Sequence, residues 1–93
     1  MLNQLILDMN KQLTEAKRNV ATAITEEKRL ARQVDAQREK ASEWERRAMV
    51  ALRAGKEDLA REALVRKKRE EDYAEQLSTQ YDKQHEAVEQ LKA

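Results

Sequence analysis

The stretch ALRAGKEDLAREAL, residues 51–64, contains the only glycine of the 93-residue chain and separates two long segments with helical patterns. A glycine inside a helix costs about 1 kcal/mol relative to alanine, whereas a glycine just past a helix end adopts the left-handed cap conformation without strain. Arg53 before Gly55, and Glu57 and Asp58 after it, suit the dipoles of a helix end and a helix start. These signals favour a reversal of the chain. The predicted turn consists of Ala54, Gly55 and Lys56.

The spacing of apolar residues changes at this glycine. From Leu2 onward, alternating steps of four and three meet thirteen apolar residues in fifteen positions, a sustained heptad pattern that requires a partner helix. The same register fails beyond Gly55, where a different register that includes Ala63 becomes apolar. One continuous helix would place these stripes on different faces, so we expect two antiparallel helices, about 2–53 and 57–92. A break within one long helix, as a stutter would produce, is the alternative.

The two registers predict an all-α fold, a long antiparallel two-helix coiled-coil hairpin that forms a single domain over residues 1–93 with its tip near Gly55. The apolar positions that face the partner helix form the predicted core: Val20, Leu30, Val34, Trp44, Leu59, Ala63, Leu77, Tyr81 and Val88. Trp44 has two interpretations, a docking aromatic for a partner or a core side chain. The small alanine expected opposite the ring favours the core.

Polar seam positions also come together in this hairpin, because facing residues have numbers that add to about 110 when a short loop reverses the chain at Gly55. Three pairs of opposite charge result: Glu27 with Lys83, Lys40 with Glu70, and Glu43 with Lys67. Exposed pairs contribute only about 0–1 kcal/mol each, so we expect them to select the alignment more than to stabilise it.

The predicted arms differ in length, about 78 Å for the first helix and about 54 Å for the second at 1.5 Å per residue. Residues 2–16 therefore have nothing opposite them, although they form the most apolar stretch of the sequence. We name its apolar face the association stripe, which consists of Leu2, Leu5, Ile6, Met9 and Leu13. An exposed apolar stripe of this size marks an interface. We expect either a second chain to cover it in a homo-oligomer, or this chain to be a fragment of a longer one.

The composition provides few of the residue types that catalysis, metal binding or nucleic-acid binding require. Charged residues make up 40% of the chain and aromatic residues 3%, which is typical of a coiled coil. The net charge of +1 argues against a nucleic-acid binder, which needs a basic surplus. His85 is the only histidine and there is no cysteine, so the ligands of a zinc site are missing. We therefore expect no catalytic residue, no cofactor, no metal and no enzyme. The basic run at residues 66–69 is followed at once by acidic residues, which favours a solvated face over lipid contact.

Four stretches together resemble a known family: LILDMNKQLTEAK (5–17), EEKRLARQVD (26–35), SEWERRAMVAL (42–52) and the opening ALRAGKEDLAREAL. They are similar to the phage-shock protein A (PspA) family, which includes the vesicle-inducing protein of plastids and cyanobacteria. The resemblance covers essentially all 93 residues, and its most specific part is the tip around Gly55. It implies a long helical hairpin followed by further helices.

The resemblance also implies a function. Family members are peripheral membrane proteins of the cytoplasmic inner face of the membrane or of the thylakoid, and they polymerise in an architecture related to ESCRT-III proteins. They protect or remodel stressed membranes, and some inhibit an AAA+ transcription activator through the hairpin. The family's amphipathic first helix and its later helices have no counterpart here, so we expect lipid contact only through segments missing from this chain. The sequence thus predicts a non-catalytic structural module. A regulatory module that binds the activator and an unrelated coiled-coil spacer are the alternatives.

Overall fold

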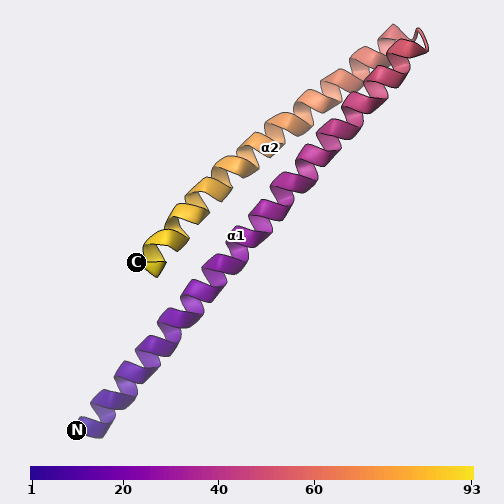
Figure 1. Cartoon of the computed structure of the whole chain (residues 1–93). Coiled ribbons are helices and arrows are strands. Elements are labelled where there is room, and N and C mark those ends of the chain that lie inside the picture. Colours follow the sequence, from indigo (N-terminus) through magenta and orange to yellow (C-terminus); the bar gives the residue numbers. More distant parts are fainter.

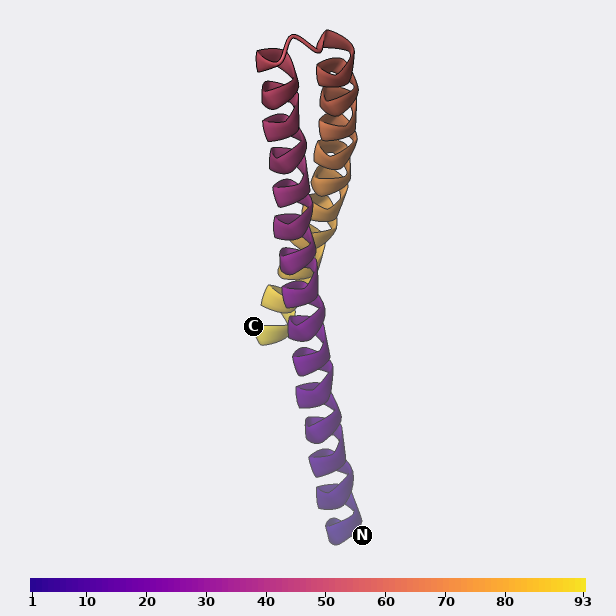
Figure 2. The ribbon, with the colours of Figure 1, turned by 90° about the vertical axis from the view of Figure 1, so that its right-hand side faces the viewer.

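The computed structural model describes all 93 residues, nearly all of them in two helices, α1 (Leu2–Arg53) and α2 (Glu57–Lys92). The helices run antiparallel, and the N-terminal part of α1 continues well past the end of α2 (Figure 1). The molecule measures 81 × 15 × 14 Å. A view turned by 90° shows the C-terminal part of α2 passing behind α1 to its other side (Figure 2). The predicted all-α hairpin is confirmed.

The turn between the helices ends α1 with a Schellman motif. Ala54 closes the helix at φ −83° and ψ 0°, and Gly55 follows at φ +73°, in the left-handed region that favours glycine. The amide of Gly55 donates to the carbonyl of Leu52 at 3.0 Å. The amide of Lys56 donates to the carbonyl of Ala51 at 2.8 Å. Two carbonyls without partners inside the helix are thereby satisfied, and the chain reverses within three residues.

The core is a single seam between α1 and α2. Its buried residues are Leu30, Val34, Gln37, Ala41 and Ala48 on α1, and Ala60, Ala63, Ala74, Leu77 and Val88 on α2. On α1 they follow the predicted alternation of four and three. Leu30, Val34 and Leu77 form one cluster, against which Tyr81 packs. Fully burying a side chain of Leu or Val size contributes about 1.5–3 kcal/mol, so this cluster anchors the middle of the hairpin.

Small side chains make up the seam toward the tip. Five of the ten buried residues of the chain are alanines, and alanine removes less apolar area from water than leucine or valine. Burial of apolar side chains therefore stabilises the tip half of the hairpin less than its middle. Gln37 is the one buried polar side chain, at 9% exposure. No buried side-chain nitrogen or oxygen lacks a hydrogen-bond partner.

The prediction that Leu59 belongs to the core is wrong. Leu59 is 52% exposed, whereas its neighbour Ala60 is 2% exposed and occupies the seam. In a heptad pattern, the seam position before Ala63 lies three residues earlier, at Ala60. Leu59 is one residue further and therefore lies outside the seam. Of the other predicted core residues, Leu30, Val34, Ala63, Leu77 and Val88 are buried, and Val20, Trp44 and Tyr81 are half-buried.

The predicted register pairs are not present. Glu27 is paired with His85 of α2 rather than with Lys83. Lys40 and Glu70 are not among the residues that form ion pairs. The predicted alignment of the helices is close, but the partners of the charged residues are shifted along α2.

Lys67 shows the same shift. Its Nζ lies 3.4 Å from Oε1 of Glu45, two residues beyond the predicted Glu43. Side chains of a helix lean toward its own N-terminus, so in an antiparallel pair the two sets lean in opposite directions along the axis. A side chain of α1 therefore meets a residue of α2 that lies further from the tip than the one directly opposite. Pairing by backbone position alone misses this offset.

Candidate association surfaces and polar contacts

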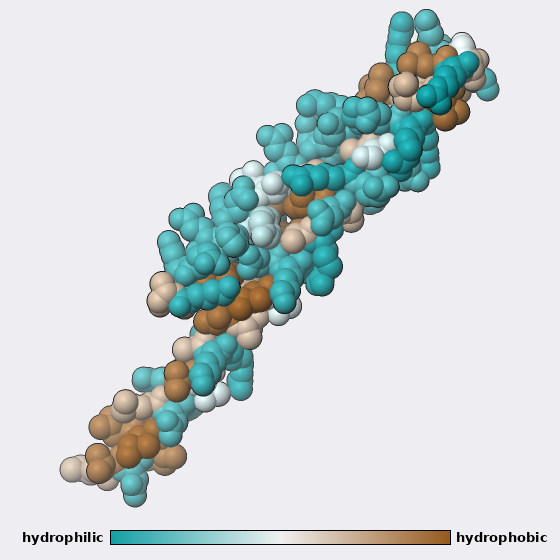
Figure 3. Space-filling model, in the orientation of Figure 1, coloured by the Kyte–Doolittle hydropathy of each residue, from teal (hydrophilic) through white to brown (hydrophobic).

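The association stripe lies on the part of α1 that α2 does not reach. All of residues 1–19 are exposed. The five side chains of the stripe are between 48% and 72% exposed, and they are Leu2, Leu5, Ile6, Met9 and Leu13. A space-filling view shows hydrophobic residues gathered over this end of the molecule (Figure 3). The stripe continues the heptad seam that α2 covers further along, so the same face of α1 is buried in one half and open in the other.

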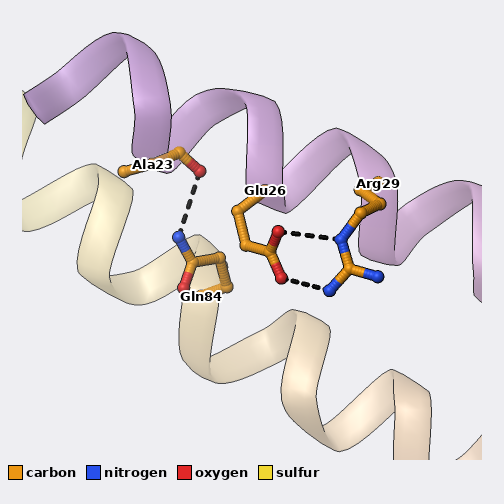
Figure 4. Close-up of polar contacts among 4 residues, drawn as sticks. All are labelled: Ala23, Glu26, Arg29 and Gln84. Carbon is orange, nitrogen blue, oxygen red and sulfur yellow. Dashed lines mark hydrogen bonds and ion pairs between the residues drawn. The ribbon is translucent and has the colours of Figure 1, made fainter. Parts of the chain in front are cut away.

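Polar contacts hold the open end of the hairpin, where α2 ends against α1. Nε2 of Gln84 donates to the carbonyl oxygen of Ala23 at 3.0 Å (Figure 4). One residue further, Nδ1 of His85 pairs with Oε1 of Glu27, and the imidazole stacks on the Tyr81 ring at 5.8 Å between centroids. The hydrogen bond to the Glu27 carboxylate raises the pKa of His85 above its ordinary value. A protonated His85 therefore forms an ion pair with Glu27 that links α2 to α1 at this end.

Beside this contact, the Glu26 carboxylate accepts hydrogen bonds from two nitrogens of the Arg29 guanidinium, as Figure 4 shows. The pair lies within α1. The hydrogen bonds lower the pKa of the Glu26 carboxyl and raise that of Arg29. The side chains of Arg29 and Glu26 are 50% and 41% exposed, so the pair contributes little beyond local helix support.

A second uncovered apolar region lies at the tip. The exposed apolar side chains there are Met49, Val50, Leu52, Leu59, Leu64 and Val65, each between 45% and 63% exposed. Figure 3 shows this patch at the end of the molecule opposite to the association stripe. The sequence analysis singled out the turn but missed the patch, because heptad counting looks only for the face that meets the partner helix. Several of these residues stand just beside the seam, and this was the available signal.

The basic run at residues 66–69 has carboxylates close to most of its cations. Arg66 lies 3.5 Å from Glu62, and Lys68 lies 3.0 Å from Asp72. The hydrogen bond and the negative charge of Asp72 raise the pKa of Lys68. Lys67 pairs across the hairpin with α1, as described above. Three of the four cations are therefore paired with carboxylates, two of them within α2, as in a solvated helix face.

The structure contains no group of three or more His, Cys, Asp or Glu side chains that could hold a metal ion. Neither helix combines the length and the apolar character needed to cross a membrane.

These features define an elongated coiled-coil hairpin whose uncovered apolar surfaces lie at its two ends. Comparison with known proteins places that hairpin in a family. The chain belongs to the PspA/IM30 family, whose model matches residues 1–93. The resemblance read from the sequence is thereby confirmed, and an unrelated coiled-coil spacer is excluded.

Individual relatives support this assignment. The chain is 42% identical over 90 residues to the membrane-associated protein VIPP1, chloroplastic, of Oryza sativa subsp. japonica, and 41% identical over 91 residues to the membrane-associated protein Vipp1 of Synechocystis sp.. It is 37% identical over 91 residues to a phage shock protein A homolog of Deinococcus radiodurans. These matches cover 97%, 98% and 98% of this chain, but only 28%, 34% and 41% of the three relatives. The hairpin thus corresponds to about a third of the relatives' length.

Proposed function

We propose that this chain is the hairpin module of a membrane-associated stress-response and membrane-remodelling protein, and that it acts without catalysis through self-association of its helices. The observation that carries the proposal is the association stripe, an apolar seam left uncovered in a chain whose relatives are named as membrane-associated. The shape supports a structural role, because the molecule is a rod only 15 Å across that buries ten residues.

The size of the stripe sets the strength of the association. Five side chains that are about half exposed would contribute about 5 kcal/mol per copy if fully covered, at about 1.5–3 kcal/mol for complete burial of each. Two copies that cover each other would gain about twice that, against an association cost of about 4–15 kcal/mol. The interface between two chains is therefore weak. In an assembly of many copies, each chain makes several such contacts at once. Interfaces that are weak one by one then hold the assembly together.

Sedimentation of a matched pair of variants tests this proposal. Ile6→Glu with Leu13→Glu places two charges on the stripe, whereas Gln4→Glu with Thr14→Glu places the same two charges on other faces of the same helical segment. We expect the parent chain and the second variant to self-associate with rising concentration, and the first variant to remain monomeric. A parent chain that stays monomeric at millimolar concentration with this segment helical contradicts the proposal.

The setting of the module is part of the same proposal. Two of the relatives are membrane-associated proteins by name, which supports a role at a membrane, and we propose a peripheral position at its cytoplasmic inner face. Because the chain spans about a third of these relatives, we assign lipid contact to other parts of the longer protein. Flotation of the isolated chain with anionic vesicles should leave it in the unbound fraction. Flotation of the chain together with the vesicles would refute the assignment of lipid contact to other parts of the protein.

A regulatory role is the alternative, in which the hairpin binds and inhibits an AAA+ transcription activator. The similarity to a phage shock protein A homolog favours it. Mixing the chain with such an ATPase separates the two functions. Loss of ATPase activity that persists in the Ile6→Glu and Leu13→Glu variant would assign inhibition to another surface of the hairpin.

A further inference from the structure

Methionine is the only sulfur-containing residue of this chain, which has three methionines and no cysteine. All three are exposed, Met9 at 59% and Met49 at 46%. An accessible thioether is oxidised to the sulfoxide, and this reaction converts a flexible apolar side chain into a polar one. The consequence of oxidation therefore depends on the surface in which each methionine lies.

Met9 lies at the centre of the association stripe. Leu5 and Ile6 precede it by four and three residues, and Leu13 follows it by four. Residues at these spacings are neighbours on one face of a helix. These neighbours and Leu2 carry only hydrocarbon side chains, which peroxide does not attack. Met9 is thus the one residue of the stripe whose polarity a redox reaction can change.

The other two methionines lie outside the stripe. Met1 precedes the first residue of α1, and Met49 belongs to the apolar patch at the tip, at the opposite end of the molecule. Oxidation of either leaves all five side chains of the stripe chemically unchanged. They are therefore internal references for the effect of oxidation at Met9.

Met9 takes no part in the hairpin core. All of residues 1–19 are exposed, and α2 ends well before this part of α1 (Figure 1). A polar group added at Met9 therefore enters only the open surface. We expect oxidation there to act on association and to leave the folding of the hairpin unchanged.

The sulfoxide oxygen is costly to cover. When a second copy lies against the stripe, this oxygen loses water, and burying a polar group without a hydrogen-bond partner is unfavourable. The four other side chains of the stripe carry no donor, and the same four residues of a facing stripe carry none either. Because the interface between two chains is weak, the loss of its central apolar contact shifts the balance toward the monomer.

We propose that Met9 is a reversible oxidation site through which peroxide controls the self-association of this chain. The inference rests on the proposed function, because it regulates the surface that the proposed function uses. A lone pair of Sδ attacks one oxygen of hydrogen peroxide, so that an S–O bond forms and the O–O bond breaks. Sulfur is oxidised by two electrons and the peroxide is reduced. The departing hydroxide takes the proton of the transferred oxygen and leaves as water.

Reduction returns the stripe to its apolar state. Methionine sulfoxide reductases restore the thioether, with one enzyme for each epimer of the sulfoxide. Two thiols of the reductant become a disulfide, and the sulfoxide oxygen leaves as water. The association stripe then binds a second copy again.

The test treats the whole 93-residue chain with hydrogen peroxide and combines peptide mass spectrometry with sedimentation. When the peptide that contains Met9 has fully gained one oxygen, self-association should be weaker by at least about tenfold, because the central apolar contact is lost. Treatment with both reductases should restore it. The urea midpoint, measured at a concentration where the chain is monomeric, should stay the same.

Matched variants assign the effect to one sulfur. Met9→Leu conserves volume and apolarity, so its association should persist in peroxide although Met1 and Met49 still oxidise. Met9→Gln places a polar side chain of similar length in the stripe and should weaken association by at least about tenfold without oxidant. Met49→Gln places the same side chain at the tip, and its association should stay within about twofold of the parent because the sites are distant.

Three results would overturn the inference. They are self-association that persists after complete oxidation of Met9, equal sensitivity of Met9→Leu and the parent to peroxide, and equal effects of Met9→Gln and Met49→Gln. A parent chain that is monomeric before any oxidant is added contradicts the proposed function and this inference together. Association that peroxide leaves unchanged contradicts this inference alone, so the two failures are distinguishable.

Discussion

Replacement of Gly55 by alanine tests whether the left-handed cap is what reverses the chain. Gly55 has φ +73°, and a Cβ added there meets no atom within 4 Å. The cost is therefore one of backbone conformation alone, about 1–2 kcal/mol for an L-residue in the left-handed region. Alanine also restricts the unfolded chain, which offsets about 0.4–1 kcal/mol. We expect a net loss of about 1 kcal/mol in the free energy of unfolding, or a fall in melting temperature of about 4–8 °C.

Urea and thermal unfolding followed by circular dichroism measure this loss, with Gly55→Asn as the control because asparagine tolerates the left-handed conformation better. The chain has no cysteine, so spin labels on cysteines introduced at Lys40 and Glu70 report the fold itself. A hairpin holds the two positions near the interaxial distance of packed helices, about 10 Å. A continuous helix would separate them by about 45 Å at 1.5 Å per residue.

We expect the short distance to persist in Gly55→Ala, with reduced stability. An unfolding midpoint equal to that of the parent would refute the reasoning, because the glycine conformation would then carry no free energy. A shift to the long distance would mean that the cap is necessary for the reversal and that the apolar seams pair between two extended chains, as in domain swapping.

Three further predictions concern the seam and its polar contacts. Raising the pH should loosen the open end of the hairpin: Glu27 raises the folded-state pKa of His85, so the stabilisation is complete below the unfolded pKa of about 6.5 and is lost as the pH rises through the folded-state pKa. The urea midpoint should fall over this range in the parent and much less in His85→Ala. Leu77→Ala should cost about 2–5 kcal/mol because the side chain is 5% exposed, whereas Leu64→Ala, at 45% exposure, should cost less than about 1 kcal/mol, both by urea unfolding. Lys67→Ala should change the unfolding free energy by about 1 kcal/mol at most, because its partner carboxylate is 57% exposed.

Each of these predictions has a contrary result. The same pH slope in His85→Ala would assign the titration to another group. Equal losses at Leu77 and Leu64 would mean that burial does not control stability in this hairpin. A loss of several kcal/mol in Lys67→Ala would mean that the polar contact, and not the apolar seam, sets the alignment.

Much of the fold followed from two one-dimensional signals. The alternation of four and three on α1 identified its buried face, including Leu30 and Val34, because helix geometry places such positions on one side. The single glycine located the reversal, because few other residues adopt its backbone conformation without strain. The family followed from the order of residues around that glycine, and the comparisons bear it out.

The errors arose where the two helices meet. Leu59 was assigned to the core because it is apolar and close to the second register, and only the packing of the helices distinguished it from Ala60. The ion pairs were assigned by backbone position, whereas the opposite lean of side chains in antiparallel helices moves the partner of Glu27 to His85.

The sequence by itself determined two helices, their buried faces, the place of the turn and the mismatch in arm length, because each depends on residue type and spacing along one chain. Only the tertiary structure decided which side chains meet across the seam and which contacts His85 makes. These depend on how two helices lean, cross and approach each other near the turn, and a pattern along one helix contains no information on the position of the other.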